Sequence, residues 1–408
     1  MANTILGING LGRIGKLTLW HHIGRKHFSK IVVNLGRKVG NSLKDVAFYI
    51  QHDSTYGRLH NYLYGYKSKS VIEKIDEVES TIVIDGVPVK ILTENRNPKD
   101  IKWEKEGAKL VVDTTGKFLD PTLPSDAKDG SVRGHLESGA YKVLVSAPFK
   151  IKDKIKETPD DAVTIIMGIN EEMYDSKRHQ IISGASCTTT CLAHMMKPLL
   201  DYFGAERILS VSMATVHAVT ASQQVLDRVP KTNATDLRKI RSAMNNIILT
   251  STGAAKTLAQ VLPEMRNIGF IAQSVRVPII TGSLIILVVA FRDEEDNLIT
   301  GDLINKIYKE AEEREKRGYL LFTDDQKVST DIVGFYGPAA IIEGSETHTR
   351  TAMITLDISK VCTIGAPSVE KLQVPVTQAV IYGWYDNELG SYTNMLGDLT
   401  VKVAKDVY

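Results

Sequence analysis

Cysteine is scarce in this sequence: it occurs three times in 408 residues, and two of the three, Cys187 and Cys191, lie close together. Three cysteines are too few for a disulfide framework, and such usage is typical of a reducing compartment. A structural zinc site needs a second pair of ligands at matching spacing, whereas Cys362 stands alone. We therefore expect neither disulfide bonds nor a metal site.

Long hydrophobic runs and an excess of one charge are also missing. The apolar stretch from Val277 to Phe291 is interrupted by Pro278 and Gly282, so it predicts a buried strand rather than a membrane span. The 50 basic and 48 acidic residues leave a net charge of +2, which gives no basis for a nucleic-acid partner. The N-terminus has no secretory signal pattern. We expect a cytoplasmic protein without a membrane partner.

A glycine-rich turn is the first feature that points to a function. Residues 10–15 read GLGRIG, a G-x-G-x-x-G pattern. They lie between a predicted strand, Thr4 to Ile8, and a predicted helix that ends near Lys26, and a second strand is expected at Lys30 to Asn34. Glycines let the backbone approach a pyrophosphate, and the helix N-terminus offers unpaired N–H groups. This unit predicts dinucleotide binding, with a plain packing turn as the alternative.

The pattern of strands and helices changes near residue 185. Before it, the strands expected at Lys109 to Asp113 and Lys142 to Ser146 end in small polar residues, as beside the ligand crevice of an open parallel sheet. The polar stretches Lys67 to Val78 and Lys150 to Asp161 are expected to be surface excursions. After it, the β-branched runs at 208–216 and 277–291 predict a sheet that is mainly antiparallel.

These patterns predict an α/β protein of two domains. We expect a Rossmann-type doubly wound sheet at 1–186, completed by a C-terminal helix at 387–408, and an α+β catalytic domain at 187–386. Within the second domain, apolar residues at helical spacing predict a helix from Asp302 to Arg317, which Gly318 ends.

Cys187 is the candidate nucleophile. It stands in the stretch GASCTTTCLAH at 184–194. A helix predicted from Cys187 to Leu200 would place its sulfur at the positive helix end, which lowers the pKa of a thiol. The hydroxyls of Ser186, Thr188 and Thr189 are natural helix caps. The alternative is a small buried hydrophobe, which is our interpretation of Cys191.

His217 is the candidate base for this thiol. It closes the strand predicted from Ile208 to Val216, in ATVHAVTAS. The alternative is a satisfied core histidine, as most lone histidines are.

Six segments together resemble one family, the phosphorylating glyceraldehyde-3-phosphate dehydrogenases. They run along nearly the whole chain in the family's order: INGLGRIGK at 8–16, ASCTTTC at 185–191, TVHAVTASQ at 215–223, STGAAK at 251–256, VRVP at 275–278 and GWYDNELGSY at 383–392. The resemblance implies a homotetramer and assigns roles to residues. Cys187 resembles the nucleophile and His217 its base. Eight residues resemble the family's cofactor contacts: Gly10, Gly12, Arg13, Ile14, Gly15, Arg96, Ser146 and Asn387. Seven residues resemble the family's contacts with inorganic phosphate and with the phosphate group of the substrate: Ser186, Thr188, Thr220, Lys239, Thr252, Gly253 and Arg276.

The resemblance also implies the reaction. The Cys187 thiolate adds to the aldehyde of glyceraldehyde 3-phosphate, and His217 takes the hydroxyl proton as hydride leaves for the nicotinamide. Inorganic phosphate then attacks the thioester and releases 1,3-bisphosphoglycerate. A nucleophile of this kind divides one difficult step into two easier ones.

The sequence departs from the family where the second strand ends. The family carries an acidic residue there that binds the ribose hydroxyls, whereas Leu35 stands here, followed by Arg37 and Lys38. A carboxylate repels a 2′-phosphate, and two cations attract one. We therefore expect the cofactor to be NADP or NAD, with a preference for NADP or dual use. The alternative is that the two cations are solvated loop charges.

Extra length separates this chain from the family's usual size. It falls near Asp120 to Arg133 and between Arg314 and His348, and its role, as oligomer contact or plain loop, stays open. Two other functions also stay open: an erythrose-4-phosphate dehydrogenase with the same Cys187 chemistry, and a non-catalytic scaffold protein.

Overall fold

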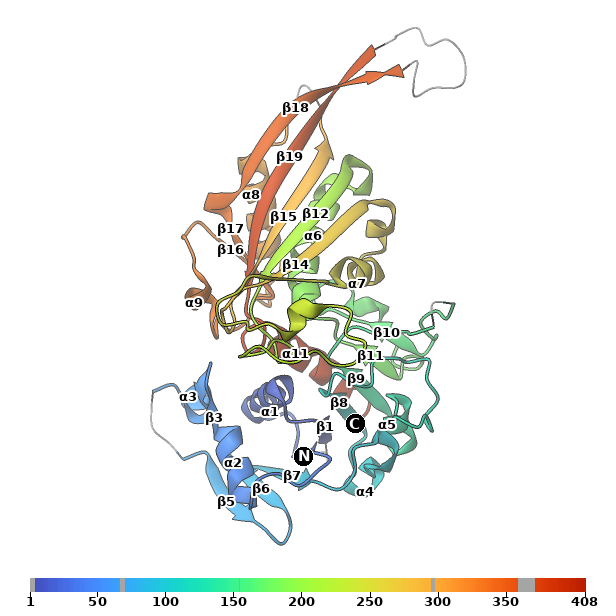
Figure 1. Ribbon diagram of the computed structural model, residues 1–408, viewed down its shortest axis with the longest axis vertical. Helices are drawn as coiled ribbons and strands as arrows, with labels where there is room; N and C mark the ends of the chain where they lie inside the picture. The colour runs from blue at the N-terminus through green and yellow to red at the C-terminus, as the bar shows by residue number, and fades with distance from the viewer. Residues whose placement is uncertain (1–3, 67–69, 154, 295–297, 359–370) are drawn as a thin grey trace. The chain divides into compact units, whose positions relative to one another are not determined.

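The glycine-rich turn joins the first strand of a large sheet to a long helix. The computed structural model describes residues 4–66, 70–153, 155–294, 298–358 and 371–408. The chain divides into two units, Met1–Cys187 with Glu388–Tyr408, and Thr188–Asn387. Cys362, the third cysteine, and Lys67 to Lys69 lie outside the described residues. Each unit is built around its own sheet (Figure 1).

The N-terminal unit holds a nine-stranded sheet in the order β10-β11-β9-β8-β1-β2-β7-β6-β5. Its strands from β10 to β7 pair in parallel, and β7, β6 and β5 are antiparallel. The strands are β1 (Ile5–Asn9), β2 (Lys30–Asn34), β5 (Ile72–Asp76), β6 (Thr81–Ile84), β7 (Val87–Leu92), β8 (Leu110–Asp113), β9 (Lys142–Val145), β10 (Ala162–Thr164) and β11 (Ile181–Ser183), and β3 (His52–Asp53) pairs with β4 (Gly57–Arg58) apart from the sheet.

The helices of this unit frame the parallel part of the sheet. They are α1 (Arg13–Arg25), α2 (Leu43–Gln51), α3 (Leu59–Tyr64), α4 (Trp103–Glu106), α5 (Arg133–Glu137) and α11 (Tyr392–Ala404). The C-terminal helix α11 packs against α1, and Arg25 donates to Asn394 and pairs with Asp398. The helix expected at 387–408 is shorter at both ends, because residues 387–391 precede it and residues 405–408 follow it.

The strands β1, β2, β8 and β9 confirm the predicted parallel sheet, and β2 has the predicted bounds. One expectation is wrong. The stretch from Lys67 to Val78 was expected to be a surface excursion, but part of it, Ile72–Asp76, forms β5 at the edge of the sheet. Its polar composition is explained by that position: an edge strand exposes side chains that a central strand would bury.

The C-terminal unit holds an eight-stranded sheet in the order β13-β14-β12-β15-β19-β17-β16, with β18 paired to β19. Pairing is mainly antiparallel; β12 with β14 and β16 with β17 are parallel. The strands are β12 (Ile208–His217), β13 (Ile248–Thr250), β14 (Gly269–Arg276), β15 (Ser283–Arg292), β16 (Leu320–Thr323), β17 (Ala340–Glu343), β18 (His348–Asp357) and β19 (Lys371–Tyr385), and the helices are α6 (Cys187–Phe203), α7 (Ala254–Val261), α8 (Gly301–Arg314) and α9 (Ser329–Ile332).

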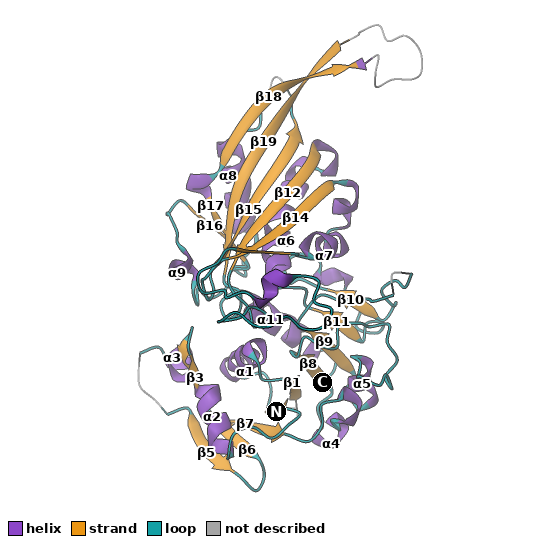
Figure 2. Ribbon diagram, viewed as in Figure 1, coloured by secondary structure: helices purple, strands orange, loops and turns teal. Residues whose placement is uncertain are grey.

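Burial in this sheet alternates along β15, whose residues are buried and half-buried in turn. One face of the strand therefore packs on the helices. Figure 2 shows β18 and β19 continuing as a two-stranded ribbon past the other strands, since β15 pairs with β19 only from Val376 onward. The fold class is confirmed, although the helix α8 ends at Arg314, three residues before the predicted end. Among the described residues, no helix is long and apolar enough to cross a membrane.

Candidate active site

The glycine-rich turn is held tightly at the carboxyl end of β1. The Gly10 N–H donates to Asn34 O at 2.9 Å, and the Thr114 hydroxyl contacts Asn9 O and Gly10 O at 3.0 and 3.1 Å. A Cβ on Gly15 would lie 2.3 Å from Gly10 O, whereas one on Gly12 would meet nothing within 4 Å. Glycine at 15 is thus required for the turn itself. The open space at Gly12 fits the close approach of a phosphate group.

A pocket of about 580 Å³ lies beside this turn, within the N-terminal unit. It brings together four of the residues expected to bind the cofactor: Gly10, Leu35, Arg37 and Arg96. Thr115, which also lines it, belongs to the small polar residues expected beside the ligand crevice after Lys109 to Asp113. Sequence reasoning did not single out the other lining residues: Asn9, Asn34, Gly36, Asn97, Lys117, Phe118, Lys128 and Asp129. Polar residues that close the strands β1 and β2, such as Asn9 and Asn34, were the available signal.

A chain of buried hydrogen bonds begins at Asn34 and Asn9, two residues that line this pocket. The Asn34 amide donates to Asn9 Oδ1, and the Asn9 amide donates to Asp113 Oδ2, each at 2.8 Å. The Trp103 indole donates to His135 Nδ1 at 2.9 Å. His135 Nδ1 must therefore accept, so the proton sits on Nε2, which lies 3.0 Å from Asp113 Oδ2. Hydrogen bonds from these and other partners hold the pKa of the buried Asp113 carboxyl below its usual value, against the opposing effect of burial.

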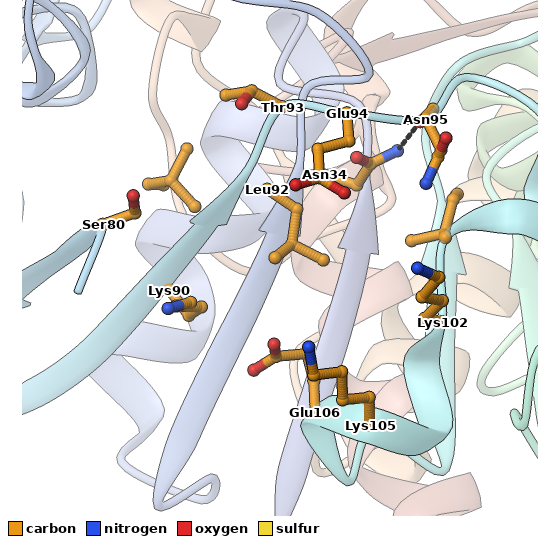
Figure 3. A pocket seen from close by; sticks show the side chains of 12 residues that line it. Asn34, Ser80, Lys90, Leu92, Thr93, Glu94, Asn95, Lys102, Lys105 and Glu106 are labelled. Atoms are coloured by element: carbon orange, nitrogen blue, oxygen red, sulfur yellow. Dashed lines mark hydrogen bonds between the residues drawn. The ribbon is translucent and has the colours of Figure 1, made fainter. Parts of the chain in front are cut away.

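The loop after β7 is fixed by the same asparagine. The Asn34 amide donates to Asn95 O at 3.0 Å, drawn as the dashed line in Figure 3. That figure shows a second pocket, of about 230 Å³, with Lys90, Lys102 and Glu106 among its lining. Arg96 follows Asn95 and donates its Nε to Gly36 O at 3.3 Å. The side chain of Asn34, which ends β2, thus bonds to the backbone after β7, and the side chain of Arg96, after β7, bonds to the backbone after β2.

Arg13 of the glycine turn has its guanidinium engaged elsewhere. It pairs with Asp53 at 2.6 Å and with Glu388 at 2.5 Å, both within the N-terminal unit. Hydrogen bonds from Lys16 and Arg13 hold the pKa of Asp53 at about 2, although burial opposes this. A contact of Arg13 with the cofactor would therefore come from its backbone N–H. Of the other expected cofactor residues in this unit, Ile14 is half-buried in α1, Lys38 is exposed, and Ser146 follows β9.

Cys187 is the first residue of α6, as predicted, and is partly exposed. The expectation that Thr188 and Thr189 cap this helix is wrong, because both lie inside it and are buried. Ser186 lies just before the helix and is half-buried. Cys191, one turn further, is fully buried, which confirms its interpretation as packing. His194 is buried too, 6.1 Å from the Tyr319 ring.

His217 closes β12 and is buried within the C-terminal unit. The Asn387 amide lies 3.3 Å from Nε2, while Asn387 Oδ1 accepts from Ser283 at 2.8 Å. The amide group therefore donates toward Nε2, while Nδ1 lies 2.7 Å from Ala218 O and also contacts Arg276 Nη1. Burial first, and the neighbouring Arg276 second, lower the pKa of His217 to about 4.

Tyr385 forms hydrogen bonds both to the start of α6 and to the end of β12. Its buried hydroxyl lies 2.9 Å from the Thr188 hydroxyl and 2.9 Å from the Thr215 hydroxyl. Thr188 is bonded to Cys187 in the chain, and Thr215 stands two residues before His217. Tyr385 was missed from the sequence, because a tyrosine in a long strand carries no signal of its partners.

The remaining residues expected to bind phosphate lie on separate elements of the C-terminal unit. Arg276 ends β14, next to His217 in the parallel register, and donates to Ala218 O at 3.1 Å. Gly253 precedes α7, and Thr252 accepts from the Ala254 N–H at 3.2 Å. Thr220 and Lys239 are exposed on the segment between β12 and β13. The structure thus brings His217, Arg276 and Asn387 into one cluster. Within the described residues, no group of acidic, cysteine and histidine side chains is arranged to hold a metal ion.

Comparison with known protein families finds one matching family domain in each half of the sequence. The family description "Glyceraldehyde 3-phosphate dehydrogenase, NAD binding domain" matches residues 4–121, and the C-terminal domain of the same family matches residues 186–361. A protein of Streptomyces avermitilis, glyceraldehyde-3-phosphate dehydrogenase 2, is 36% identical over 98% of this chain and 99% of its own length. Glyceraldehyde-3-phosphate dehydrogenase 1 of Bacillus subtilis is 33% identical over 98% of both chains. The chain therefore belongs to the glyceraldehyde-3-phosphate dehydrogenase family of oxidoreductases, which carries an NAD-binding domain of the Rossmann type.

Proposed function

We propose that the protein oxidises glyceraldehyde 3-phosphate with a nicotinamide cofactor and inorganic phosphate, forming 1,3-bisphosphoglycerate through a thioester on Cys187. The single observation that carries the proposal is the state of His217. Its pKa of about 4 keeps the buried imidazole uncharged at neutral pH, and Nε2 lies 3.3 Å from the Asn387 side-chain amide. A group in this state accepts a proton at neutral pH.

Each step assigns work to residues of this chain. His217 Nε2 takes the proton of the Cys187 thiol as the sulfur bonds to the aldehyde carbon, and it returns that proton to the alkoxide, which gives a thiohemiacetal. His217 Nε2 then removes the hydroxyl proton while the carbon–hydrogen bond breaks. The bound nicotinamide supplies the acceptor for that hydride. Phosphate attacks the thioester carbon, and the sulfur leaves as thiolate, so the nucleophile is regenerated.

Two sets of residues are proposed to bind the anions. Arg276 and Thr220 would bind the phosphate of the substrate, with Lys239 as a further cation. Ser186, Thr188, Thr252 and Gly253 would bind inorganic phosphate. Hydroxyls, backbone N–H groups and a guanidinium are suited to phosphate oxygens, and Gly253 stands at the N-terminus of α7. Asn387 would orient the nicotinamide amide.

We also propose a preference for NADP over NAD, or dual use. The support is the charge of the pocket beside the glycine turn. Arg37, Arg96, Lys117 and Lys128 line it, and Asp129 is the single carboxylate among its described lining residues. Leu35 stands at the carboxyl end of β2 and lines the same pocket. A 2′-phosphate would meet cations and no acidic residue on β2.

We propose in addition that the enzyme is a cytoplasmic homotetramer. The apolar side chains of Leu249 on β13 and Ile271 on β14 are 54% and 64% exposed. Exposed apolar side chains of this kind are stabilised when a neighbouring subunit covers them. Sedimentation equilibrium measures the subunit number, and a stable monomer would contradict this part of the proposal.

The proposal is tested by a spectrophotometric assay of NAD(P)H formation with glyceraldehyde 3-phosphate, with and without phosphate. We expect activity that requires phosphate, a higher kcat/KM with NADP, and a loss of activity of at least about a thousandfold in Cys187→Ser. Turnover of erythrose 4-phosphate without phosphate, or full activity of Cys187→Ser, would overturn it.

Leu35→Asp, which places a carboxylate beside the ribose, should shift the ratio of kcat/KM values toward NAD by about tenfold or more.

A further inference from the structure

The segment between β8 and α5 is longer than the family resemblance leads us to expect, and two of its residues, Lys128 and Asp129, line the pocket beside the glycine turn. It reads DPTLPSDAKDGSVR at 120–133. Pro121 to Gly130 forms neither helix nor strand. The question is whether this segment is a plain surface loop or part of a site.

Hydrogen bonds fix both ends of the segment. The Asp120 carboxylate accepts from the Thr122 N–H at 3.0 Å and from the Lys152 N–H at 3.0 Å. At the other end, the Arg133 guanidinium donates to Pro121 O at 2.7 Å and forms two bonds to Asp161. The two ends of the segment are therefore joined, since Arg133, its last residue, binds Pro121, its second residue.

The middle of the segment packs on the wall of the cofactor pocket. Gly130 adopts a φ of +82°, and a Cβ there would lie 2.7 Å from Phe118 Cε1 and 3.2 Å from Asn97 Oδ1. Both Phe118 and Asn97 line the pocket of about 580 Å³. Glycine at 130 thus allows an approach that any side chain would prevent.

Two charged residues immediately before Gly130 line that pocket themselves. They are Lys128 and Asp129. Lys128 is exposed and joins three other cations around the space, Arg37, Arg96 and Lys117. An exposed lysine on an unattached loop would be an ordinary solvated charge, but this loop is fastened at both ends and seated against Phe118.

We propose that the segment Pro121–Gly130 forms one wall of the site for the adenosine half of the cofactor, and that Lys128 is a specificity-determining residue for a phosphate on the adenosine ribose. The ligand class is an adenosine nucleotide that carries a 2′-phosphate. This inference rests on the proposed preference for NADP, and it names the part of the chain beyond Arg37 that produces it.

The experiment uses two probes of the adenosine half, 2′,5′-ADP and 5′-AMP, whose dissociation constants are measured by calorimetry at fixed ionic strength. In Lys128→Ala, we expect the affinity for 2′,5′-ADP to fall about tenfold and that for 5′-AMP by less than about twofold. Lys150→Ala is the matched control, because Lys150 is an exposed cation on a neighbouring segment that does not line the pocket. It should leave both affinities unchanged.

The outcomes separate this inference from the cofactor proposal. The wild-type ratio of the two affinities tests the preference for a 2′-phosphate, whereas the difference between the two lysine variants tests Lys128. No loss in Lys128→Ala, an equal loss for both probes, or an equal effect of Lys150→Ala would overturn the assignment. Recovery of 2′,5′-ADP affinity in Lys128→Arg would support a charge contact rather than a change of fold.

Discussion

At the scale of single residues, the proposed chemistry depends on the neutral state of His217. Its pKa of about 4 lies below the ordinary value because burial and Arg276 both disfavour the imidazolium. A base with a lowered pKa stays unprotonated as pH falls, until the pH approaches that pKa. His217 is therefore available as a base throughout the neutral range.

His217→Gln should lower kcat by about 10² to 10⁴-fold, because the side chain that takes the hydroxyl proton is removed. In the wild type, we expect kcat/KM to stay level from pH 8 to pH 6 and to fall only as the pH approaches His217's pKa of about 4. The variant should instead rise with pH, following ionisation of the thiol. Steady-state pH profiles of both proteins check this, and a wild-type acid limb centred near pH 6.5 would contradict it.

His22 offers a residue-scale test of stability. It is fully buried, and neither ring nitrogen has a hydrogen-bond partner among the described residues. Burial lowers its pKa well below the ordinary value, so below about pH 6.5 the unfolded chain takes up a proton that the folded chain refuses. Stability from this group is complete above that pH and is lost as the pH falls.

His22→Leu should therefore keep or raise the free energy of unfolding, by up to about 1 kcal/mol at pH 8, since two unpaired polar atoms are removed. The gain should increase below pH 6.5, by up to about 1.4 kcal/mol per pH unit. Urea unfolding at pH 8 and pH 5.5 measures both effects. A variant that is less stable than the wild type at pH 5.5 would show that His22 has a favourable partner.

The sequence indicated some of these residues and not others, for a physical reason. Cys187 and Leu35 stand in local patterns, a run of hydroxyls and the end of a strand, which are visible without a fold. The chain from Asn9 to Asp113 and His135 joins positions more than 100 residues apart. Only the pairing of β1 with β8 brings them together, and no local pattern encodes that register.

At the scale of elements, the sequence predicted strands correctly where burial of apolar side chains determines the composition of the strand. Four of the parallel strands, β1, β2, β8 and β9, are short apolar runs, and each of their ends lies within one residue of the predicted one. Edge strands failed, as β5 shows, because an exposed strand keeps polar residues and looks like a loop. The end of α8 was placed too late, because the sequence continues with charged helix formers until Gly318.

The glycine turn allows a matched test at this scale. Gly15→Ala should destabilise the free protein by about 1–3 kcal/mol, because the added Cβ would lie 2.3 Å from Gly10 O. Gly12→Ala should leave the free protein nearly as stable, since nothing lies within 4 Å of the added atom. It should still weaken dinucleotide binding, because that open space is where the pyrophosphate is proposed to approach. Thermal unfolding and cofactor titration separate the two; equal stability of both variants would count against this role of Gly15.

At the scale of the whole molecule, the residues with proposed roles are divided between the two units. The pocket for the dinucleotide belongs to the N-terminal unit, and His217 with Arg276 belongs to the C-terminal unit. In the sequence, Cys187 is the last residue of the first run of the N-terminal unit. The next residue, Thr188, belongs to the C-terminal unit, where its hydroxyl lies 2.9 Å from that of Tyr385. The sequence predicted such a change of character near residue 185, since the patterns on either side differ.

The most direct measurement of the central claim is a single-turnover experiment without phosphate. The protein, saturated with NADP, is mixed rapidly with glyceraldehyde 3-phosphate, and reduced cofactor is followed by absorbance. The account predicts a burst of one reduced cofactor per subunit, then little further turnover until phosphate is added, because the acyl group stays on Cys187. Absence of a burst, or continuous turnover without phosphate, would contradict a thioester on Cys187 as the intermediate.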